Sequence, residues 1–205
     1  EVIRGESIVK PPRGEKLPDM IQGQCIIKVG DKITTDHIMP AGTLLKHRSN
    51  VPEYAKYVFD PLNEDGQPTF AQRAQDAQRE GIAGVIVAGD SYGQGSSREH
   101  AALCPMYLGV KVVIAKAIER IHQSNLVNFA ILPLTFCDPA EIENIQADDK
   151  LQIDNVTETI AAGETITVKN ITQNTEILCN VQLSPRQRKI LAAGGLLRYT
   201  VCNDQ

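Results

Sequence analysis

Short apolar runs alternate with amphipathic stretches in the first two thirds of the chain. The apolar runs predict strands over residues 24–29, 82–88, 110–115 and 131–136. The amphipathic stretches predict two helices, one over residues 70–80 between a Thr69 cap and Gly81, and one over residues 117–129. Because helices alternate with buried strands, we expect a largely parallel sheet with helices covering it.

The pattern changes after Asp138. Alternating apolar and polar positions predict further strands over residues 150–153, 165–168 and 176–181, which we expect to be antiparallel or mixed. A last helix is predicted from Ser184-Pro185 to Gly194-Gly195. The predicted fold class is therefore α/β, with a partly parallel central sheet, flanking helices and additional mixed or antiparallel strands.

The length of 205 residues and the apolar content of 42% suit one domain. We place it at residues 21–205, after a linker-like segment, residues 1–20, that contains Pro11-Pro12. The chain begins with Glu1 and not with methionine, which indicates a processed chain or a piece of a longer one. Residues 51–68 are expected to form a long irregular connection, a kind of loop that often acts as a lid or a binding loop.

Charge and composition argue against several classes of protein. The net charge of −4, with no basic stripe, argues against nucleic acid as a partner. No apolar run reaches the roughly 18 to 20 residues that span a bilayer, and the start Glu1-Val2-Ile3-Arg4 is not a secretory signal. We therefore expect a cytoplasmic protein without membrane contact.

The cysteines and histidines indicate no metal site within the chain. The cysteines are widely spaced, with no Cys-x-x-Cys pair, so we expect buried, reduced thiols and neither a disulfide framework nor an iron–sulfur site. They are Cys25, Cys104, Cys137, Cys179 and Cys202. The four histidines show no spacing typical of zinc ligands, and His100 is expected to be packed or hydrogen-bonded.

The stretch from Gly89 to His100 lies between a predicted buried strand and a predicted helix. Ser96 and Glu99 fit a Ser-x-x-Glu capping box, which would place Ser97 and Arg98 in the first turn, where free amides and the helix dipole favour an anion. A tight turn with a good cap is the structural alternative. The stretch lacks the third glycine of a dinucleotide loop and the lysine of a phosphate-binding loop.

The serines beside Arg98 suggest proton transfer. A serine hydroxyl is a weak base, but an adjacent guanidinium and a helix N-terminus make its alkoxide less costly. Such a serine could remove a proton from a carbon acid whose carboxylates are held by Arg98 and Arg48, although Arg48 taken alone would be a solvated surface residue. Asp36 is either a turn or cap carboxylate or a partner that orients an arginine or serine, and it should point away from His37 on an extended backbone.

Two segments, residues 30–42 and 89–103, resemble the C-terminal swivelling domain of the aconitase family. The resemblance runs from about Ile21 to the C-terminus and includes residues 115–122 and 132–136. It implies a swivelling β/β/α domain in which Ser96 is the catalytic base, while Ser97, Arg98 and Arg48 bind substrate. Cys104, where many members have glutamate, is expected to pack.

The resemblance also implies a reaction and its partners. Citrate would be dehydrated to cis-aconitate and rehydrated to isocitrate, with a [4Fe-4S] cluster whose ligands lie outside this chain, in other domains or a large subunit. The isolated chain would be inactive. Alternatives are the small subunit of isopropylmalate isomerase, a homoaconitase- or methylcitrate-type hydro-lyase, and an RNA-binding regulatory module, which the negative charge disfavours.

Overall fold

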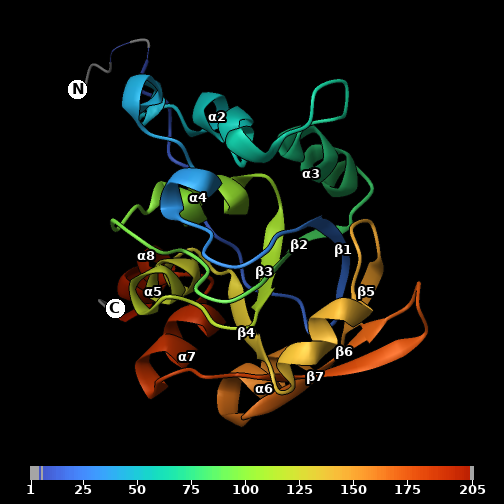
Figure 1. Ribbon diagram of the computed structural model, residues 1–205. Coiled ribbons are helices and arrows are strands. Elements are labelled where there is room, and N and C mark those ends of the chain that lie inside the picture. The colour runs from blue at the N-terminus through green and yellow to red at the C-terminus, as the bar shows by residue number, and fades with distance from the viewer. Residues whose placement is uncertain (1–4, 6, 204–205) are drawn as a thin grey trace.

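Seven strands close into a barrel in the computed structural model, which describes residues 5 and 7–203 (Figure 1). Residues 1–4 and 6 of the predicted linker-like segment lie outside the described residues. Around the barrel the order is β1-β2-β3-β4-β7-β6-β5, with β5 next to β1. The strands are β1 (Ile21–Lys28), β2 (Ala83–Ala88), β3 (Val110–Ala115), β4 (Leu132–Phe136), β5 (Lys150–Ile153), β6 (Thr165–Asn170) and β7 (Thr175–Asn180).

The barrel has a parallel half and an antiparallel half. Strands β1 to β4 pair in parallel, and every other neighbouring pair is antiparallel. The predicted α/β class with a mixed sheet is therefore confirmed. Closure of the sheet was not predicted, because residue periodicity indicates which face of a strand is buried but not which strand lies beside it.

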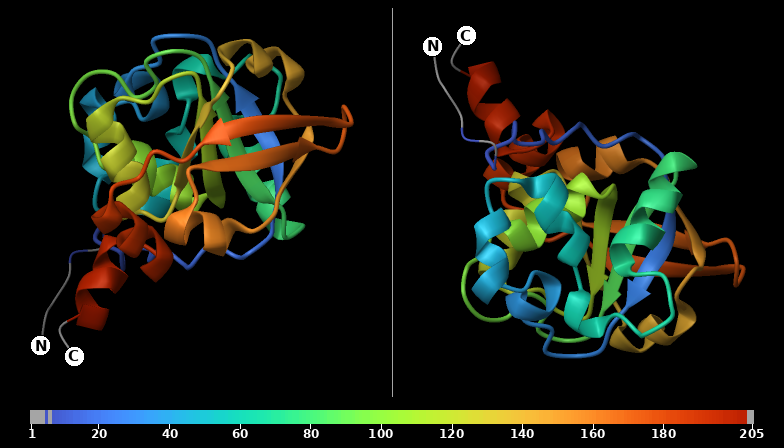
Figure 2. Two further views of the ribbon diagram at one scale, coloured as in Figure 1. Left: turned by 90° about the horizontal axis from the view of Figure 1, so that it is seen from below. Right: turned by 90° about the horizontal axis from the view of Figure 1, so that it is seen from above.

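Helices cover the outside of the parallel half. Figure 1 and the right view of Figure 2 show α2, α3 and α4 over the outer face of β1, β2 and β3. The α-helices are α1 (Thr35–Ile38), α2 (Val51–Tyr54), α3 (Phe70–Arg79), α4 (His100–Tyr107), α5 (Arg120–Asn128), α6 (Val156–Ala162), α7 (Pro185–Ala193) and α8 (Leu196–Asn203). Short 3-10 helices are η1 (Gly42–His47), η2 (Ala55–Tyr57), η3 (Asp60–Leu62) and η4 (Pro139–Asn144).

The parallel strands are buried on both faces. On β2, Val85 and Val87 belong to the cluster inside the barrel, whereas Ile86 and Ala88 belong to the cluster under the helices. Burial on both faces explains why these strands are continuous apolar runs and not alternating ones. The antiparallel strands β6 and β7 form a hairpin that projects from the body (Figure 2) and alternate between buried and more exposed residues.

One local prediction needs correction. The connection over residues 51–68 is not irregular throughout, because it contains α2, η2 and η3, and its Val58 and Phe59 are fully buried. Phe59 has a left-handed backbone (φ 56°), which interrupts any helical repeat and hides these short helices from a periodicity search.

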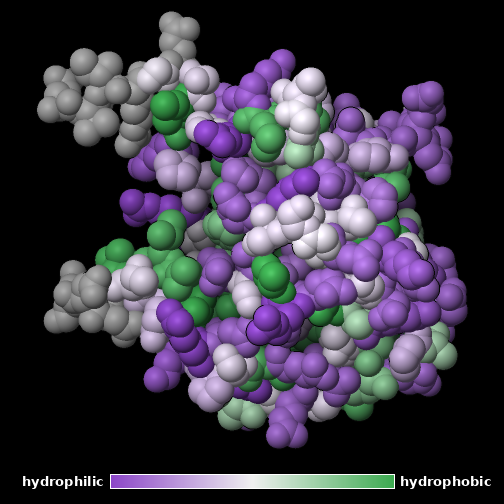
Figure 3. Space-filling view, turned by 60° about the vertical axis from the view of Figure 1, so that its left-hand side comes forward, coloured by the Kyte–Doolittle hydropathy of each residue, from purple (hydrophilic) through white to green (hydrophobic). Residues whose placement is uncertain are grey.

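No helix of the described residues is both long and apolar enough to cross a bilayer. Figure 3 shows a mainly hydrophilic face on which hydrophobic residues form small separate patches.

Three polar loops follow the carboxyl ends of parallel strands, and one of them carries Ser96, Ser97 and Arg98, whereas Arg48 lies at the end of η1. Residues 29–34 follow β1, residues 89–99 follow β2, and residues 116–119 follow β3. Because these strands are parallel neighbours, the three loops meet at one edge of the barrel, where open α/β sheets commonly bind their ligands.

Candidate functional site

The loop from Gly89 to Glu99, here named the serine loop, is anchored first to the segment after β3. Tyr92 is fully buried; its N–H donates to the Ala117 carbonyl (2.9 Å) and its carbonyl accepts from the Glu119 N–H (2.9 Å). The Ser91 hydroxyl donates to the Glu119 carboxylate at 2.5 Å. These contacts fix the start of the loop against residues 117–119.

A second anchor joins the serine loop to the segment after β1. The Gly93 N–H donates to the Ile33 carbonyl (2.8 Å), and the Thr35 N–H donates to the Gln94 carbonyl (2.9 Å). The Thr35 hydroxyl also donates to the Ser96 carbonyl at 3.0 Å. Gly95 between them has φ +103°, a conformation that a residue with a Cβ rarely adopts.

The tip of the loop, residues 96–98, differs from the predicted capping box. Helix α4 begins at His100 with Glu99 as its N-cap, and no side chain caps it. Ser96 and Ser97 are exposed, and neither hydroxyl has a hydrogen bond within the part of the chain that the structure describes. Bonds from distant residues hold the tip outside the helix, so the Ser96 hydroxyl is not used as a cap and is free for chemistry.

Arg98 is oriented by Asp36. Its guanidinium forms a bidentate pair with both carboxylate oxygens, Nη1 to Oδ1 and Nη2 to Oδ2 (3.0 Å), and Nη1 also donates to the Met39 carbonyl (3.4 Å). The hydrogen bond from Arg98 is the main cause that lowers the pKa of Asp36. Of the two readings left open for Asp36, this geometry supports the partner that orients an arginine.

The backbone around Asp36 is helical and not extended, so that premise of the prediction was wrong. Residues 35–38 form α1 with Thr34 as its N-cap, and the two side chains of a capping box are Thr34 and His37. His37 Nδ1 accepts from the Thr34 N–H at 3.1 Å. His37 therefore fixes the start of α1, while Asp36 faces Arg98.

The backbone of Arg48 is joined to the start of α4 by His100, a contact that the sequence could not reveal. His100 Nε2 donates to the Arg48 carbonyl at 2.9 Å. The His100 ring also lies against Tyr54, with ring centroids 5.2 Å apart, and the Tyr54 hydroxyl donates to the Pro40 carbonyl (2.8 Å). The Arg48 side chain is exposed and has no ion pair or hydrogen bond among the described residues, so it is available to an anion.

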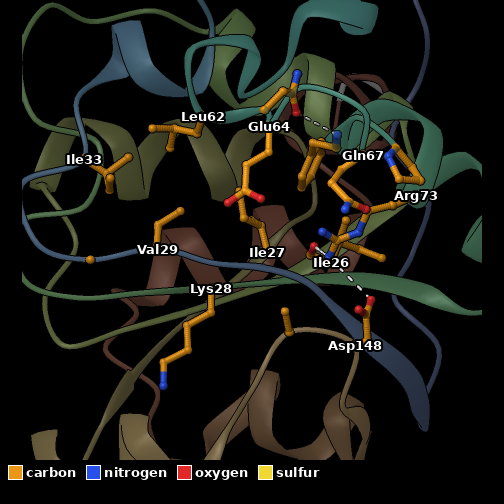
Figure 4. A pocket seen from close by; sticks show the side chains of 15 residues that line it. Ile26, Ile27, Lys28, Val29, Ile33, Leu62, Glu64, Gln67, Arg73 and Asp148 are labelled. Carbon is orange, nitrogen blue, oxygen red and sulfur yellow. Dashed lines mark hydrogen bonds and ion pairs between the residues drawn. The ribbon is translucent and has the colours of Figure 1, made fainter.

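A separate cleft of about 760 Å³ lies between β1 and the segment from η3 to α3 (Figure 4). Ile27 and Leu62 form apolar walls, the Glu64 side chain points into it, and Arg73 pairs with Asp148 at 3.4 Å. None of the four predicted site residues lines this cleft. The serine loop instead presents its tip on an open surface.

The four cysteines whose side chains are described lie apart from one another. Cys104 packs beneath the helices, as predicted, and Cys25 and Cys179 lie inside the barrel; burial raises the pKa of each thiol to about 12. Cys137 is exposed, contrary to the expectation, and the Cys202 side chain lies outside what is described. Separated, protonated thiols do not fit as ligands of an iron–sulfur cluster, and no group of three potential ligands gathers within the described residues.

Comparison with known protein families shows to which family this chain belongs. The model of the aconitase C-terminal domain matches residues 28–139, more than half of the chain. The chain belongs to this family. The family match includes Asp36, Arg48, Ser96, Ser97 and Arg98, so the expected resemblance is confirmed.

Relatives of this aconitase C-terminal domain are larger proteins. It is 39% identical over 164 residues to the mitochondrial aconitate hydratase of Schizosaccharomyces pombe. The aligned residues cover 73% of this chain and 21% of that protein. It is 34% identical over 174 residues to the mitochondrial aconitate hydratase of Saccharomyces cerevisiae, covering 78% of this chain and 22% of that protein. The chain thus spans about a quarter or less of these curated relatives.

A solved structure matches the aconitase C-terminal domain over nearly its whole length. The crystal structure of 3-isopropylmalate dehydratase from Methanocaldococcus jannaschii has a TM-score of 0.68 and 28% sequence identity, and the match covers 90% of this chain and 95% of that one. The names of the curated relatives contradict the expected cytoplasmic location, since those enzymes are mitochondrial. Charge and composition, on which that expectation depended, do not distinguish one aqueous compartment from another.

Proposed function

We propose that this chain is the C-terminal domain of an aconitate hydratase and supplies the base and the carboxylate-binding side chains for interconversion of citrate and isocitrate. The observation that carries the proposal is the free Ser96 hydroxyl at the tip of a doubly anchored loop, beside an arginine that Asp36 orients. The aconitate hydratases among the relatives support the same reaction.

In the proposed reaction Ser96 acts as the base. Its alkoxide removes the proton from a carbon next to a substrate carboxylate, and the electron pair of that C–H bond forms the double bond of cis-aconitate as hydroxide leaves the neighbouring carbon. Rehydration reverses these steps at the other carbon, with Ser96 returning the proton. The cationic groups Arg98 and Arg48 bind the carboxylates and lower the cost of the alkoxide.

The remaining chemistry belongs outside this chain. A [4Fe-4S] cluster, carried by other domains of the same protein, would supply the Lewis acid for the departing hydroxyl. We place the domain at residues 21–205 and the connection to the cluster-bearing part at residues 1–20. Because the serine loop is open to solvent, the reaction cavity needs a second surface, and swivelling of this domain onto it would bring base and substrate together.

The substrate preference of the full-length protein tests this proposal. We expect the highest kcat/KM with citrate or isocitrate, lower values with methylcitrate, homocitrate and isopropylmalate, and no turnover by residues 1–205 alone. Preferred turnover of isopropylmalate would overturn the assignment to aconitate hydratases.

A second candidate is the small subunit of an isopropylmalate isomerase. The observation in its favour is the match to 95% of the 3-isopropylmalate dehydratase chain. The two candidates differ in where the cluster-bearing part is encoded. Cluster-ligand cysteines in the same reading frame upstream of Glu1 favour the aconitate hydratase, whereas a start codon there favours the subunit.

A further inference from the structure

Helix α5 contains a histidine that the proposed reaction does not use. His122, in α5, is 1% exposed, and its ring meets the ring of Tyr92 edge-on, with centroids 5.2 Å apart and planes at 67°. Tyr92 belongs to the serine loop, so this contact joins α5 directly to the loop that carries Ser96.

The His122 ring also lies directly beneath Gly93. A Cβ on Gly93 would be 2.3 Å from His122 Cγ and 2.4 Å from Cδ2, and Gly93 has φ +84°. The loop therefore passes so close to the ring that only glycine fits, both for space and for conformation. Two residues further on, Gly95 turns the chain into Ser96.

Proton transfer does not explain His122. Neither ring nitrogen has a hydrogen-bond partner in the described part of the chain. Burial lowers its pKa to about 4, so the ring is neutral at physiological pH. The ring therefore acts on the loop through its packing contacts with Tyr92 and Gly93.

We propose that His122 is a positioning residue for catalysis, whose ring supports Gly93 and Tyr92 and thereby fixes the backbone that presents Ser96. The proposal depends on the proposed function of Ser96. Arg98 is held separately by Asp36, so the loss of His122 should displace the base more than the substrate carboxylates. A displacement of about 1 Å in an active site can lower turnover about 100-fold.

Kinetics of His122→Ala in the full-length enzyme test the proposal. We expect kcat to fall about 10- to 100-fold while KM changes by less than about 3-fold. Added imidazole, which fits the space left by the ring, should restore part of kcat. The matched control is Leu126→Ala, which empties an equally buried site one turn further along α5 and should lower the Tm while leaving kcat unchanged.

A reciprocal variant covers the case in which His122→Ala does not fold. Gly93→Ala should lower kcat because its methyl group meets the His122 ring, and His122→Asn in that background should recover part of the loss by making room. Recovery supports the contact, and an additive loss in the double variant contradicts it.

Hydrogen exchange of the amides of residues 91–98 separates this proposal from the proposed function. If the wild-type protein turns over none of the tested substrates, the proposed function fails. Hydrogen exchange then remains as the test of the positioning role of His122. Faster exchange in the His122 variant than in Leu126→Ala supports the positioning role. A folded His122→Ala protein with unchanged kcat and unchanged exchange, or a Leu126→Ala protein with the same losses, overturns it.

Discussion

The two parts of the serine loop are built in opposite ways. In its anchored part, from Gly89 to Gly95, Tyr92 is buried and backbone hydrogen bonds join the chain to the segments after β1 and β3. In its tip, Ser96 and Ser97 are exposed and their hydroxyls have no partner in the described structure. The fold therefore fixes the backbone of the loop and leaves the two hydroxyls unbonded within the described structure, as the proposed contact with a substrate requires.

This comparison makes a general prediction. Substitutions in the anchored part of the loop should lower folding stability first. Substitutions in the tip should lower catalysis while the protein stays folded. The experiments below test that division, from the largest expected effect to the smallest.

Tyr92→Ala should have the largest effect on stability. Removal of a fully buried aromatic side chain costs about 3–5 kcal/mol, seen as a lower Tm of the full-length protein. Tyr92→Phe is the matched control: the Tyr92 hydroxyl is buried without a partner among the described residues, so its loss should cost less than about 1 kcal/mol. Equal damage by both changes would contradict the packing role of the ring.

His122 should make stability depend on pH. The ring is neutral in the folded protein, with a pKa of about 4, but gains a proton in the unfolded chain below pH 6.5. Stability is therefore fully present above pH 6.5 and falls toward pH 4, by up to about 3 kcal/mol. In unfolding measurements across this range, His122→Asn should show a smaller fall than the wild type; an identical fall would refute the linkage.

Arg98→Lys should weaken catalysis with little change in stability. Lysine cannot form the bidentate pair with Asp36 or with a carboxylate, so kcat/KM should fall about 10- to 100-fold, mainly through KM. Steady-state kinetics measure the fall, and thermal unfolding measures the expected constancy of Tm. A large drop in Tm would mean that Arg98 stabilises the anchored part of the loop and does not act only in the tip.

Asp36→Asn should give a smaller effect of the same kind. Arg98 keeps its place in part, and KM should rise about 3- to 10-fold with kcat retained. Since Arg98 lowers the pKa of Asp36, the wild-type carboxylate stays ionised, and the ratio of the two KM values should not change between about pH 6 and pH 9. A ratio that varies with pH would point to another titrating group.

A change on the antiparallel half should have almost no effect. Leu178 in β7 is 45% exposed and lies on a strand that contributes no site residue. Leu178→Ser should change stability by less than about 0.5 kcal/mol and leave kcat/KM unchanged. A loss of turnover would extend the site to the hairpin.

Local signals in the sequence predicted much of the fold. Thr69 and Ser184 cap α3 and α7 as predicted, because a cap and the amides it binds are close neighbours in the chain; the structure adds that each takes part in a capping box. Closure of the barrel depends on pairing of Ile21–Gln24 with Lys150–Ile153. No local pattern encodes a contact over such a separation.

The site follows the same division. The Ser96-x-x-Glu99 pattern predicted a helix start that the structure lacks, because Thr35 and Asp36, 61 and 62 residues away from their partners, hold the tip in place. Residue chemistry predicted an anion site with a serine base beside Arg98 and Arg48, and the family resemblance assigned the base to Ser96 and substrate binding to Ser97; these catalytic roles remain predictions. The contact of His100 with the Arg48 carbonyl could be found only in three dimensions.

Exchange of the carbon-bound substrate proton with deuterium oxide tests the central claim, that the loop presents Ser96 as the base. In the full-length enzyme, Ser96→Ala should lose exchange and turnover by about 100- to 10,000-fold while still binding citrate with near wild-type affinity. Ser97→Ala, the neighbouring control, should mainly raise KM. Exchange by Ser96→Ala at the wild-type rate would show that another group is the base.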